Sequence, residues 1–235
     1  MAIEPAGGAP INGISSIATQ HVLGELADAY LRESGQRVAV ESVGGIDAAR
    51  RVQAGEAFDF VVLAADAIEK LAGSGHVLGD SRVAIARSGV AVAVGASAPR
   101  PDVSDENRMR EAVLAARSVG YSTGPSGVWV ARLFERWGIA ATIAPRVVQA
   151  QPGVPVGTLI ARGEVELGFQ QLSELVHLPG ITVVGPLPPE IQLVTTFSAA
   201  VCSVSLRQAA AGALLAFLAS PAGNAAKRRH GMEPA

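Results

Sequence analysis

Short apolar runs alternate along this chain with longer segments in which apolar residues recur every three or four positions. The short runs predict strands at 38–42, 58–63, 89–94, 118–121, 147–150, 167–170, 182–185 and 196–203. The longer segments predict helices at 18–34, 47–54, 67–73, 106–117, 127–137, 156–162 and 206–219. Because strands that alternate with helices build a mostly parallel sheet flanked by helices, the sequence predicts an α/β fold.

Two extended segments, 82–94 and 192–203, are long enough to run from one lobe into another. A chain that leaves its first lobe once and returns once builds that lobe from both of its ends. We therefore predict two lobes joined by two hinge crossovers. Residues 1–85 plus 196–235 form lobe one, and residues 86–195 form lobe two.

Four Gly- and Ser-rich turns each precede a segment with the helical pattern: Ser15–Thr19, Val43–Asp47, Ser122–Gly127 and Gln151–Pro155. The first N–H groups of a helix have no partner within the helix, and the helix dipole places about half a positive charge there. Several helix starts that converge can therefore bind one small anion without Arg or Lys. The turns predict an anion site.

The composition removes several classes of function. Only 4% of the residues are aromatic and the net charge is −2, so the chain lacks the stacking platform and the basic surface that nucleic-acid binding needs. The four histidines and one cysteine are too scattered to predict a metal site. No P-loop, dinucleotide-binding GxGxxG, G-x-S-x-G or HExxH motif is present, so we expect no cofactor.

Residues 1–8 contain neither a basic segment nor an apolar core of the kind that forms an export signal. As written, the sequence predicts a cytoplasmic protein; if a signal had been removed, the same protein would be periplasmic. Since no stretch approaches ~18 uninterrupted apolar residues, we expect no membrane span.

Several motifs resemble, in their order, the type II periplasmic solute-binding proteins and, within them, the molybdate-binding group. They are the helix at 18–30 with Ser34-Gly35, ARRVQAGEAFDFVV at 49–62, AAD at 64–66, Pro125–Gly127 before a helix, TLIARGEVELGF at 158–169 and LLAFLASP at 214–221. The resemblance covers almost the whole chain. It implies a two-lobed α/β clamshell that closes by hinge motion around a small anion in the cleft between the lobes.

The resemblance also implies which residues contact the ligand. Lobe one would contribute the turns at 15–19 and 44–46, and lobe two the turns at 126–127 and 154–155 together with the segment after Phe169. With the neighbouring hydroxyls and amides, the predicted ligand-binding residues are Ser15, Ser16, Thr19, Gly44, Gly45, Ser122, Thr123, Ser126, Gly127, Val154, Gln170 and Gln171.

This chain departs from the molybdate-binding pattern at three places. Gly44 and Gly45 stand where the family commonly has a Ser hydroxyl, Gln171 matches the position of the family's site Tyr, and Asp47 lies beside the second turn. A carboxylate next to an oxyanion pocket repels the ligand, so the departures argue against simple recognition of molybdate.

Several of these residues have a second interpretation. Ser15 and Ser16 precede a helix, where Ser is also an ordinary N-cap. Gly44-Gly45 could form an anion-binding nest with positive φ or simply a tight strand-to-helix turn. Asp47 could be a helix N-cap or a general base, and His21 a surface histidine or an acid–base group.

Two functions follow, and a third remains open. The leading hypothesis is a binding protein for a small multiply charged anion, either a molybdate-type oxyanion or a di- or tricarboxylate, with an ABC permease as partner if it is exported. The alternative is an isomerase of the aconitate isomerase type, because such enzymes look like molybdate-binding proteins; Asp47 or His21 would then transfer the proton. The third is an anion sensor.

Overall fold

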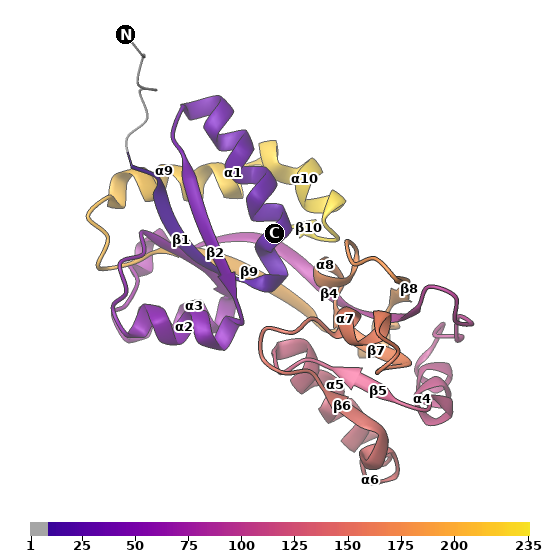
Figure 1. Ribbon diagram of the computed structural model, residues 1–235. Helices are drawn as coiled ribbons and strands as arrows, with labels where there is room; N and C mark the ends of the chain where they lie inside the picture. The colour runs from indigo at the N-terminus through magenta and orange to yellow at the C-terminus, as the bar shows by residue number, and fades with distance from the viewer. Residues whose placement is uncertain (1–8) are drawn as a thin grey trace. The chain divides into compact units, whose positions relative to one another are not determined.

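The computed structural model describes residues 9–235, which belong to two compact units (Figure 1). Unit 1 comprises Met1–Arg87 and Thr196–Ala235, and unit 2 comprises Ser88–Thr195. Residues 1–8, on which the expectation about an export signal depends, lie outside the described part.

Unit 1 is built from both ends of the chain. Its first part contains β1 (Ile11–Ser16), α1 (Gln20–Ser34), β2 (Val38–Val43), α2 (Gly45–Gln53), β3 (Phe60–Ala64), α3 (Ala65–Gly73) and the beginning of β4 (Val83–Gly95). Its second part contains most of β9 (Val194–Val201), α9 (Gln208–Ala219), α10 (Asn224–Arg229) and β10 (Glu233–Pro234).

The sheet of unit 1 has the strand order β2-β1-β3-β9-β4, and β10 also pairs with β4. The first three strands are parallel, whereas β9 runs antiparallel to β3. Alternate strand residues point to opposite faces. Ile11 and Phe60 pack under α1 and α9, while Ile14 and Val61 pack under α2 and α3 (Figure 1). Helices therefore cover both faces of this sheet.

Strand β1 is absent from the predicted elements although it lies between β2 and β3. Its sequence, INGISS, contains Asn12 and Gly13, which are poor strand formers. The structure gives the reason for the glycine: a Cβ on Gly13 would lie 2.2 Å from the ring of Phe60. The close approach of that ring to the β1 backbone requires glycine. Because glycine is a poor strand former, the sequence pattern does not predict β1.

Unit 2 contains the rest of β4 and the segment that follows it. Its elements are α4 (Glu106–Ala115), β5 (Val119–Tyr121), α5 (Pro125–Arg136), α6 (Ala140–Ile143), β6 (Val147–Gln149), α7 (Val156–Ala161), β7 (Leu167–Gln171), α8 (Leu172–Leu175) and β8 (Ile181–Pro186).

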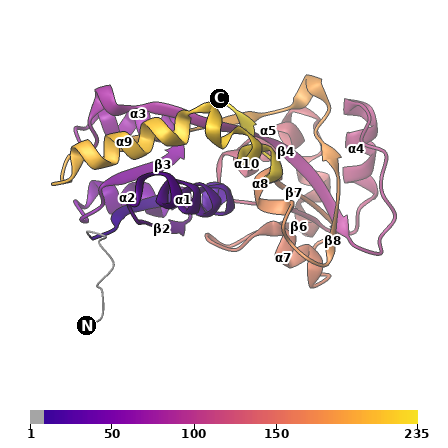
Figure 2. The same ribbon diagram turned by 90° about the horizontal axis from the view of Figure 1, so that it is seen from above.

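The sheet of unit 2 has the strand order β4-β7-β5-β6, and β8 also pairs with β4. Strand β5 is parallel to β6 and β7, whereas β4 is antiparallel to β7. Val92 and Phe169 pack on the face covered by α4 and α5, and Ala91 and Ala93 pack on the face covered by α7 and α8. Figure 2 shows α5 and α7 on opposite sides of β6 and β7.

In each unit, adjacent parallel strands end next to one another and helices begin there. Ser16 at the end of β1 pairs with Val43 at the end of β2, and Tyr121 at the end of β5 pairs with Gln149 and Phe169 of its two neighbours. In open α/β sheets, ligands bind outside the carboxyl ends of the strands. Each unit therefore has one such edge, called here its strand-end edge.

Between residues 9 and 235, no single helix has the length and apolar character to cross a membrane. Taken together, the bent pair formed by Gln208–Ala219 and Pro221–Arg229 passes that test by length and composition alone.

Candidate functional site

The strand-end edge of unit 1 brings the first two predicted turns together. A short 3-10 turn, Ile17–Thr19, follows β1 and leads into α1, and α2 begins at Gly45 directly after β2. A Cβ placed on Gly45 would lie 3.8 Å from the Ser16 Oγ, which is ordinary contact. Two helix starts and one hydroxyl thus lie side by side.

The hydroxyls of the first turn have different roles. Ser15 is fully buried and its Oγ lies 2.8 Å from the Ser42 Oγ, in a pair that joins β1 to β2. Thr19 is also buried, and its Oγ1 donates to the Ser16 carbonyl at 2.9 Å. The Ser16 Oγ accepts from the Ala18 N–H at 3.3 Å, as an N-cap does, and keeps its own proton for donation. Ser16 is therefore the hydroxyl of this turn best suited to a ligand.

The second turn corrects two of the interpretations. Gly44 has φ −56° and ψ 136°, and neither Gly44 nor Gly45 has a positive φ, so the two residues form a tight strand-to-helix turn and no αR-αL nest. The N-cap of α2 is Gly44, so Asp47 lies inside the first turn and is no N-cap. Its carboxylate is ion-paired with Arg50. The N–H groups of the first turn remain without helical partners, because Ala48 donates the first intrahelical bond, to Gly44.

His21 lies in the first turn of α1 with its ring stacked on that of His230, after α10, at a centroid distance of 6.1 Å. The Nε2 of His230 is 2.8 Å from the Glu25 carboxylate, which also pairs with Arg229. These contacts hold the Glu25 pKa below its ordinary value, chiefly through the hydrogen bond from Arg229. The surroundings of His21 are thus an α1–α10 contact.

In unit 2 the third turn is built around a very close backbone contact. Helix α5 begins with Pro125 after the N-cap Gly124, and the hydroxyls of Ser122 and Ser126 lie 3.2 Å apart. A Cβ on Gly127 would lie only 1.6 Å from the Ser122 carbonyl oxygen. Only glycine at this position lets the turn fold back on α5, which keeps the two hydroxyls together at the helix start.

In the fourth turn, some of the N–H groups form hydrogen bonds within the protein. The Val154 N–H donates to the Gln151 carbonyl at 2.9 Å, and the Val156 N–H, at the start of α7, donates to the Gln170 Oε1 at 2.7 Å. Gln170 is almost fully buried. Its amide therefore caps α7, and this turn offers fewer donors to a ligand than the sequence pattern predicts.

Gln170 and Gln171 are neighbours on β7 but point to different partners. Besides capping α7, Gln170 donates from its Nε2 to the Glu174 Oε2 at 2.5 Å. The Nε2 of Gln171 donates to the Thr195 Oγ1 at 2.7 Å, and the Gln171 Oε1 is buried without a hydrogen bond from any described residue.

Glu174 is a chemically distinctive residue that sequence reasoning missed. Burial raises the pKa of its carboxyl from 4.5 to about 7, and the hydrogen bond from Gln170 acts in the opposite direction. A carboxyl with this pKa can both accept and donate a proton near neutral pH. The available signal was its place in the first turn of a helix that directly follows a predicted strand, four residues after Gln170.

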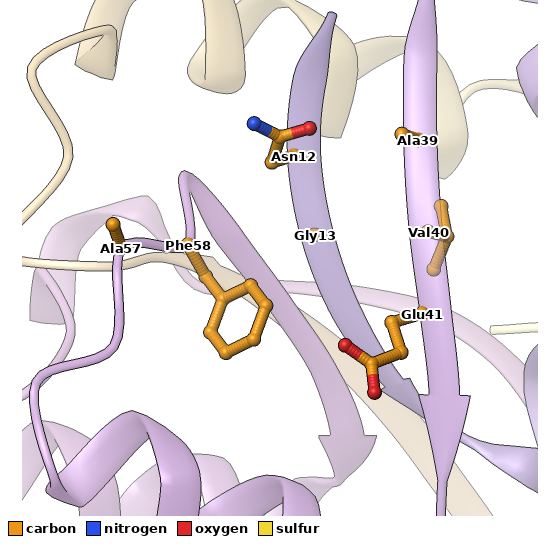
Figure 3. A pocket seen from close by; sticks show the side chains of 7 residues that line it. All are labelled: Asn12, Gly13, Ala39, Val40, Glu41, Ala57 and Phe58. Atoms are coloured by element: carbon orange, nitrogen blue, oxygen red, sulfur yellow. The ribbon is translucent and has the colours of Figure 1, made fainter.

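A hollow of about 520 Å³ lies elsewhere on unit 1, over the earlier part of β1 and β2 (Figure 3). The Glu41 carboxylate and the Phe58 ring face each other across it. Arg51 pairs with Glu41 at 2.5 Å and lies over the Phe58 ring at 5.2 Å, so its charge is already neutralised. None of the predicted ligand-binding residues lines this hollow.

Across the described range, 9–235, no group of three or more His, Cys, Asp or Glu side chains is placed to hold a metal ion. Cys202 is buried, and its burial raises the pKa of the thiol to about 12, so the thiol stays protonated.

Comparison with solved structures identifies the fold. The periplasmic molybdate-binding protein of Azotobacter vinelandii superimposes with a TM-score of 0.80 at 19% identity, over 94% of this chain and 98% of that one. The substrate-binding domain of a putative molybdenum ABC transporter from Clostridium difficile gives a TM-score of 0.75 at 14% identity, over 97% and 100%. The predicted fold class, a two-lobed α/β solute-binding fold, is confirmed.

Comparison of sequences identifies the family. An aconitate isomerase from Pseudomonas sp is 37% identical over 234 residues, which cover 96% of this chain and 89% of the relative. Residues 11–233 match the profile of the family described as bacterial extracellular solute-binding protein. The chain therefore belongs to the family of bacterial extracellular solute-binding proteins.

Proposed function

We propose that this protein binds a small multiply charged anion, held by the helix starts of both units. The observation that carries the proposal is the order of strand ends and helix starts. Helices α1 and α2 follow β1 and β2, and α5 and α7 follow β5 and β6, each as the next α-helix after a turn. In the solute-binding fold one ligand contacts both lobes, as the resemblance implies. The strand-end edge of each unit is thus proposed to contribute helix starts to the binding of an anion.

The proposed donors are neutral. In unit 1 they are the Ser16 hydroxyl and the first N–H groups of α2, and in unit 2 the hydroxyls of Ser122 and Ser126 and the start of α5. Neutral donors and helix dipoles bind an anion without the desolvation cost of burying a cationic side chain. Because the Asp47 carboxylate lies in the same turn of α2, the site favours a ligand whose charges are spread over several groups.

Among small anions, a tricarboxylate is the preferred candidate. The relative named aconitate isomerase shares 37% of its aligned residues with this chain, whereas the molybdate-related structures share 19% and 14% and support only the fold. Carboxylate groups lie several ångströms apart on a carbon skeleton, so each helix start can hold one of them.

A thermal-shift panel tests this proposal. Molybdate, tungstate and sulfate are compared with cis-aconitate, trans-aconitate and citrate. A ligand at ~100 times its dissociation constant adds ~2.7 kcal/mol of stability, which raises the Tm by about 5–10 °C for a chain of this size. We expect the tricarboxylates to give the shift. A shift with molybdate or tungstate alone would identify an oxyanion-binding protein, and no shift at all would contradict the proposal.

Variants assign the binding to the two edges. Ser16→Ala in unit 1 and Ser122→Ala in unit 2 each remove one proposed donor, and each is expected to weaken binding by about tenfold. Ser104→Ala, in an exposed loop of unit 2, is the matched control and should leave the affinity unchanged. If only one of the two site variants weakened binding, the ligand would be held by one unit alone.

A second function, isomerisation of aconitate, is favoured by the 37% identical relative of that name. Moving the double bond of this acid needs a base that takes a proton, an acid that returns it, and donors that stabilise the enolate-like charge. Proton NMR of the purified protein with cis-aconitate tests this function directly. Appearance of trans-aconitate supports an enzyme, and binding without conversion supports a pure solute-binding protein.

The place of action and the partner belong to the same proposal. The family description is extracellular and the Azotobacter vinelandii neighbour is periplasmic, which supports a periplasmic location for this protein. An ABC permease is the corresponding partner for a pure binding protein, because the Clostridium difficile neighbour is part of a putative ABC transporter. Fractionation of cells that express the native gene tests the location.

A further inference from the structure

The segment Gln170–Glu174, where β7 passes into α8, concentrates buried polar atoms at the strand-end edge of unit 2. Gln170, Gln171 and Ser173 are at most 3% exposed. Of these, Gln170 has a partner at both ends of its amide: its oxygen accepts from the Val156 N–H and its nitrogen donates to Glu174. Burying polar side chains costs desolvation free energy that apolar side chains at the same positions would not cost.

Two polar atoms of the same segment have no partner. The Gln171 Oε1 and the Ser173 Oγ are buried and form no hydrogen bond with any residue the structure describes. Buried polar atoms in proteins are nearly always satisfied, and those that are not usually bind water or a ligand. These two orphan atoms are an observation independent of Glu174, and they indicate that a polar molecule belongs beside Gln171 and Ser173.

Glu174 is held in a fixed orientation with one oxygen left over. Gln170 binds its Oε2 at 2.5 Å, while Oε1 accepts no hydrogen bond from the described residues. Glu174 as a residue is partly exposed, while its carboxyl is buried enough for its pKa to rise. Through Gln170 the carboxyl is also tied to the start of α7, one of the helix starts of the proposed anion site.

We infer that Glu174 is the residue that moves the proton when this protein isomerises aconitate, with its unpartnered Oε1 as the reacting atom. The inference rests on the isomerase function proposed above. It replaces the two candidates predicted from the sequence: Asp47 is exposed and ion-paired with Arg50, and the His21 ring is stacked on His230.

The reaction needs only one carboxyl. The Glu174 carboxylate takes a proton from the methylene carbon, and the C–H electron pair forms the new C=C bond to the central carbon. The pair of the old C=C bond moves onto the former vinyl carbon, where the attached carboxylate delocalises it. The Glu174 carboxyl then returns its proton to that carbon. One proton changes place, nothing is oxidised or reduced, and the new double bond can form with the trans geometry.

The pH dependence of the reaction follows from the surroundings of Glu174. Burial raises its pKa to about 7, opposed by the Gln170 amide, and no charged side chain contributes to the shift. The nearest titratable residue along the chain is His177, which is exposed. Since the base must be ionised to take the proton, kcat/KM should rise with pH and level off above about pH 7.

Glu174→Gln is the decisive variant. It keeps an oxygen that accepts from Gln170 but cannot carry a proton, so it should still be stabilised by cis-aconitate while kcat falls by about 10²–10⁴-fold. Glu174→Asp, which retains a retracted carboxyl, should recover part of the activity and of the pH profile. Glu135→Gln, on the exposed face of α5, is the matched control and should behave as the wild type. Conversion is followed by proton NMR in H2O and, for exchange of the transferred proton, in D2O.

The outcomes separate this inference from the function on which it rests. Wild-type conversion together with a Glu174→Gln variant that binds cis-aconitate and does not convert it supports the inference. Wild-type conversion with an unchanged kcat and pH profile in Glu174→Gln overturns the inference alone. Absence of conversion by the wild type overturns the isomerase function and the inference with it. If Glu174→Gln does not fold, Glu174→Asp with wild-type kcat and an unshifted pH profile would contradict the inference.

Discussion

The two strand-end edges both place helix starts next to strand ends, but they differ in how tightly the residues at those helix starts are packed. In unit 1 the edge is open: Gly44 and Gly45 are half-buried and form an ordinary turn, and the charged residue nearby, Asp47, is neutralised by Arg50 at the surface. In unit 2 the edge is tightly built: Gly127 admits a backbone oxygen where a side chain would lie, and Gln170 joins α7 to a carboxyl of raised pKa.

On the functions proposed above, the two edges have different roles. An open edge with exposed donors suits the capture of an anion, whereas a buried edge with a protonatable carboxyl and unpaired polar atoms suits chemistry on it. A pure binding protein needs only the first kind of edge. Four substitutions test this contrast, in decreasing order of expected effect.

Gly127→Ala should have the largest effect. Its Cβ would lie 1.6 Å from a backbone oxygen that no change of rotamer can move, so the start of α5 must shift. We expect a loss of about 3 kcal/mol or more in the free energy of unfolding, together with loss of anion binding. Gly45→Ala is the matched control at the open edge, where the new Cβ would meet ordinary contacts at 3.8 Å and should cost little. If urea unfolding gave the same loss in the free energy of unfolding for both variants, the proposed difference between the edges would be contradicted.

Glu174 should make a pH-dependent contribution to the free energy of unfolding. Because its pKa is about 7 in the folded chain and 4.5 ordinarily, the folded state binds this proton more tightly than the unfolded state does. The contribution to stability is therefore full below about pH 4.5 and is lost as the pH rises through about 7. It amounts to about 3 kcal/mol at most, since part of the side chain is exposed.

This contribution is measured as the difference between wild type and Glu174→Gln in urea unfolding at several pH values. The difference cancels the opposite contributions of the surface carboxylates whose pKa values are lowered, such as Glu41 and Glu166. Ser104→Ala, which removes no titratable group, is the control. If the difference between wild type and Glu174→Gln did not change with pH, the contrast between the edges would lose its chemical basis.

Ser15→Ala tests the internal hydroxyl pair of unit 1. The substitution removes the hydrogen bond to Ser42 at 2.8 Å, and since Ser42 is half-buried, water can replace the lost partner. A loss of about 1 kcal/mol in the free energy of unfolding is expected, with anion affinity changed less than in Ser16→Ala. A loss of binding equal to that of Ser16→Ala would show that Ser15 contacts the ligand directly.

Asp47→Asn should have the smallest effect on stability, under about 1 kcal/mol, because its ion pair with Arg50 is exposed and only the helix dipole is affected. Anion affinity should rise, since the Arg50 charge next to the start of α2 is then no longer balanced by a carboxylate. Conversion of aconitate should persist within a few-fold. A collapse of turnover measured by NMR would return the role of base to Asp47.

Much of the fold was predictable from the sequence, because the periods of apolar residues in strands and helices differ and most elements here follow them. The short elements α6, α8, α10 and β10 were not predicted, and neither was β1. Strand β1 shows the limit: Gly13 is needed for the approach of the Phe60 ring, and a residue required by a tertiary contact weakens the local strand pattern. The turns of the candidate site were predictable as helix starts for the same reason, since Ser and Gly before an apolar periodic run mark where helices begin.

The partners of the site residues were not predictable. Gln170 and Gln171 are adjacent on a strand, so the sequence predicts that their side chains point to opposite faces of the sheet. It does not predict that one binds the start of α7 and the other Thr195. Asp47 stood beside a turn and looked like a cap, but the N-cap is Gly44 and the carboxylate pairs with Arg50. Glu174 attracted no notice, because nothing in its local sequence reveals that the carboxyl is buried.

The sequence by itself determined the alternation of strands and helices, the family and the positions of the helix starts, since each depends on residues close together along the chain. The tertiary structure alone decided which N–H groups are hydrogen-bonded within the protein, why Gly127 must be glycine, and that the Glu174 carboxyl acquires a pKa of about 7. The physical reason is that burial and hydrogen bonding depend on what surrounds a group in space. In a folded chain these surroundings come from segments far apart in the sequence.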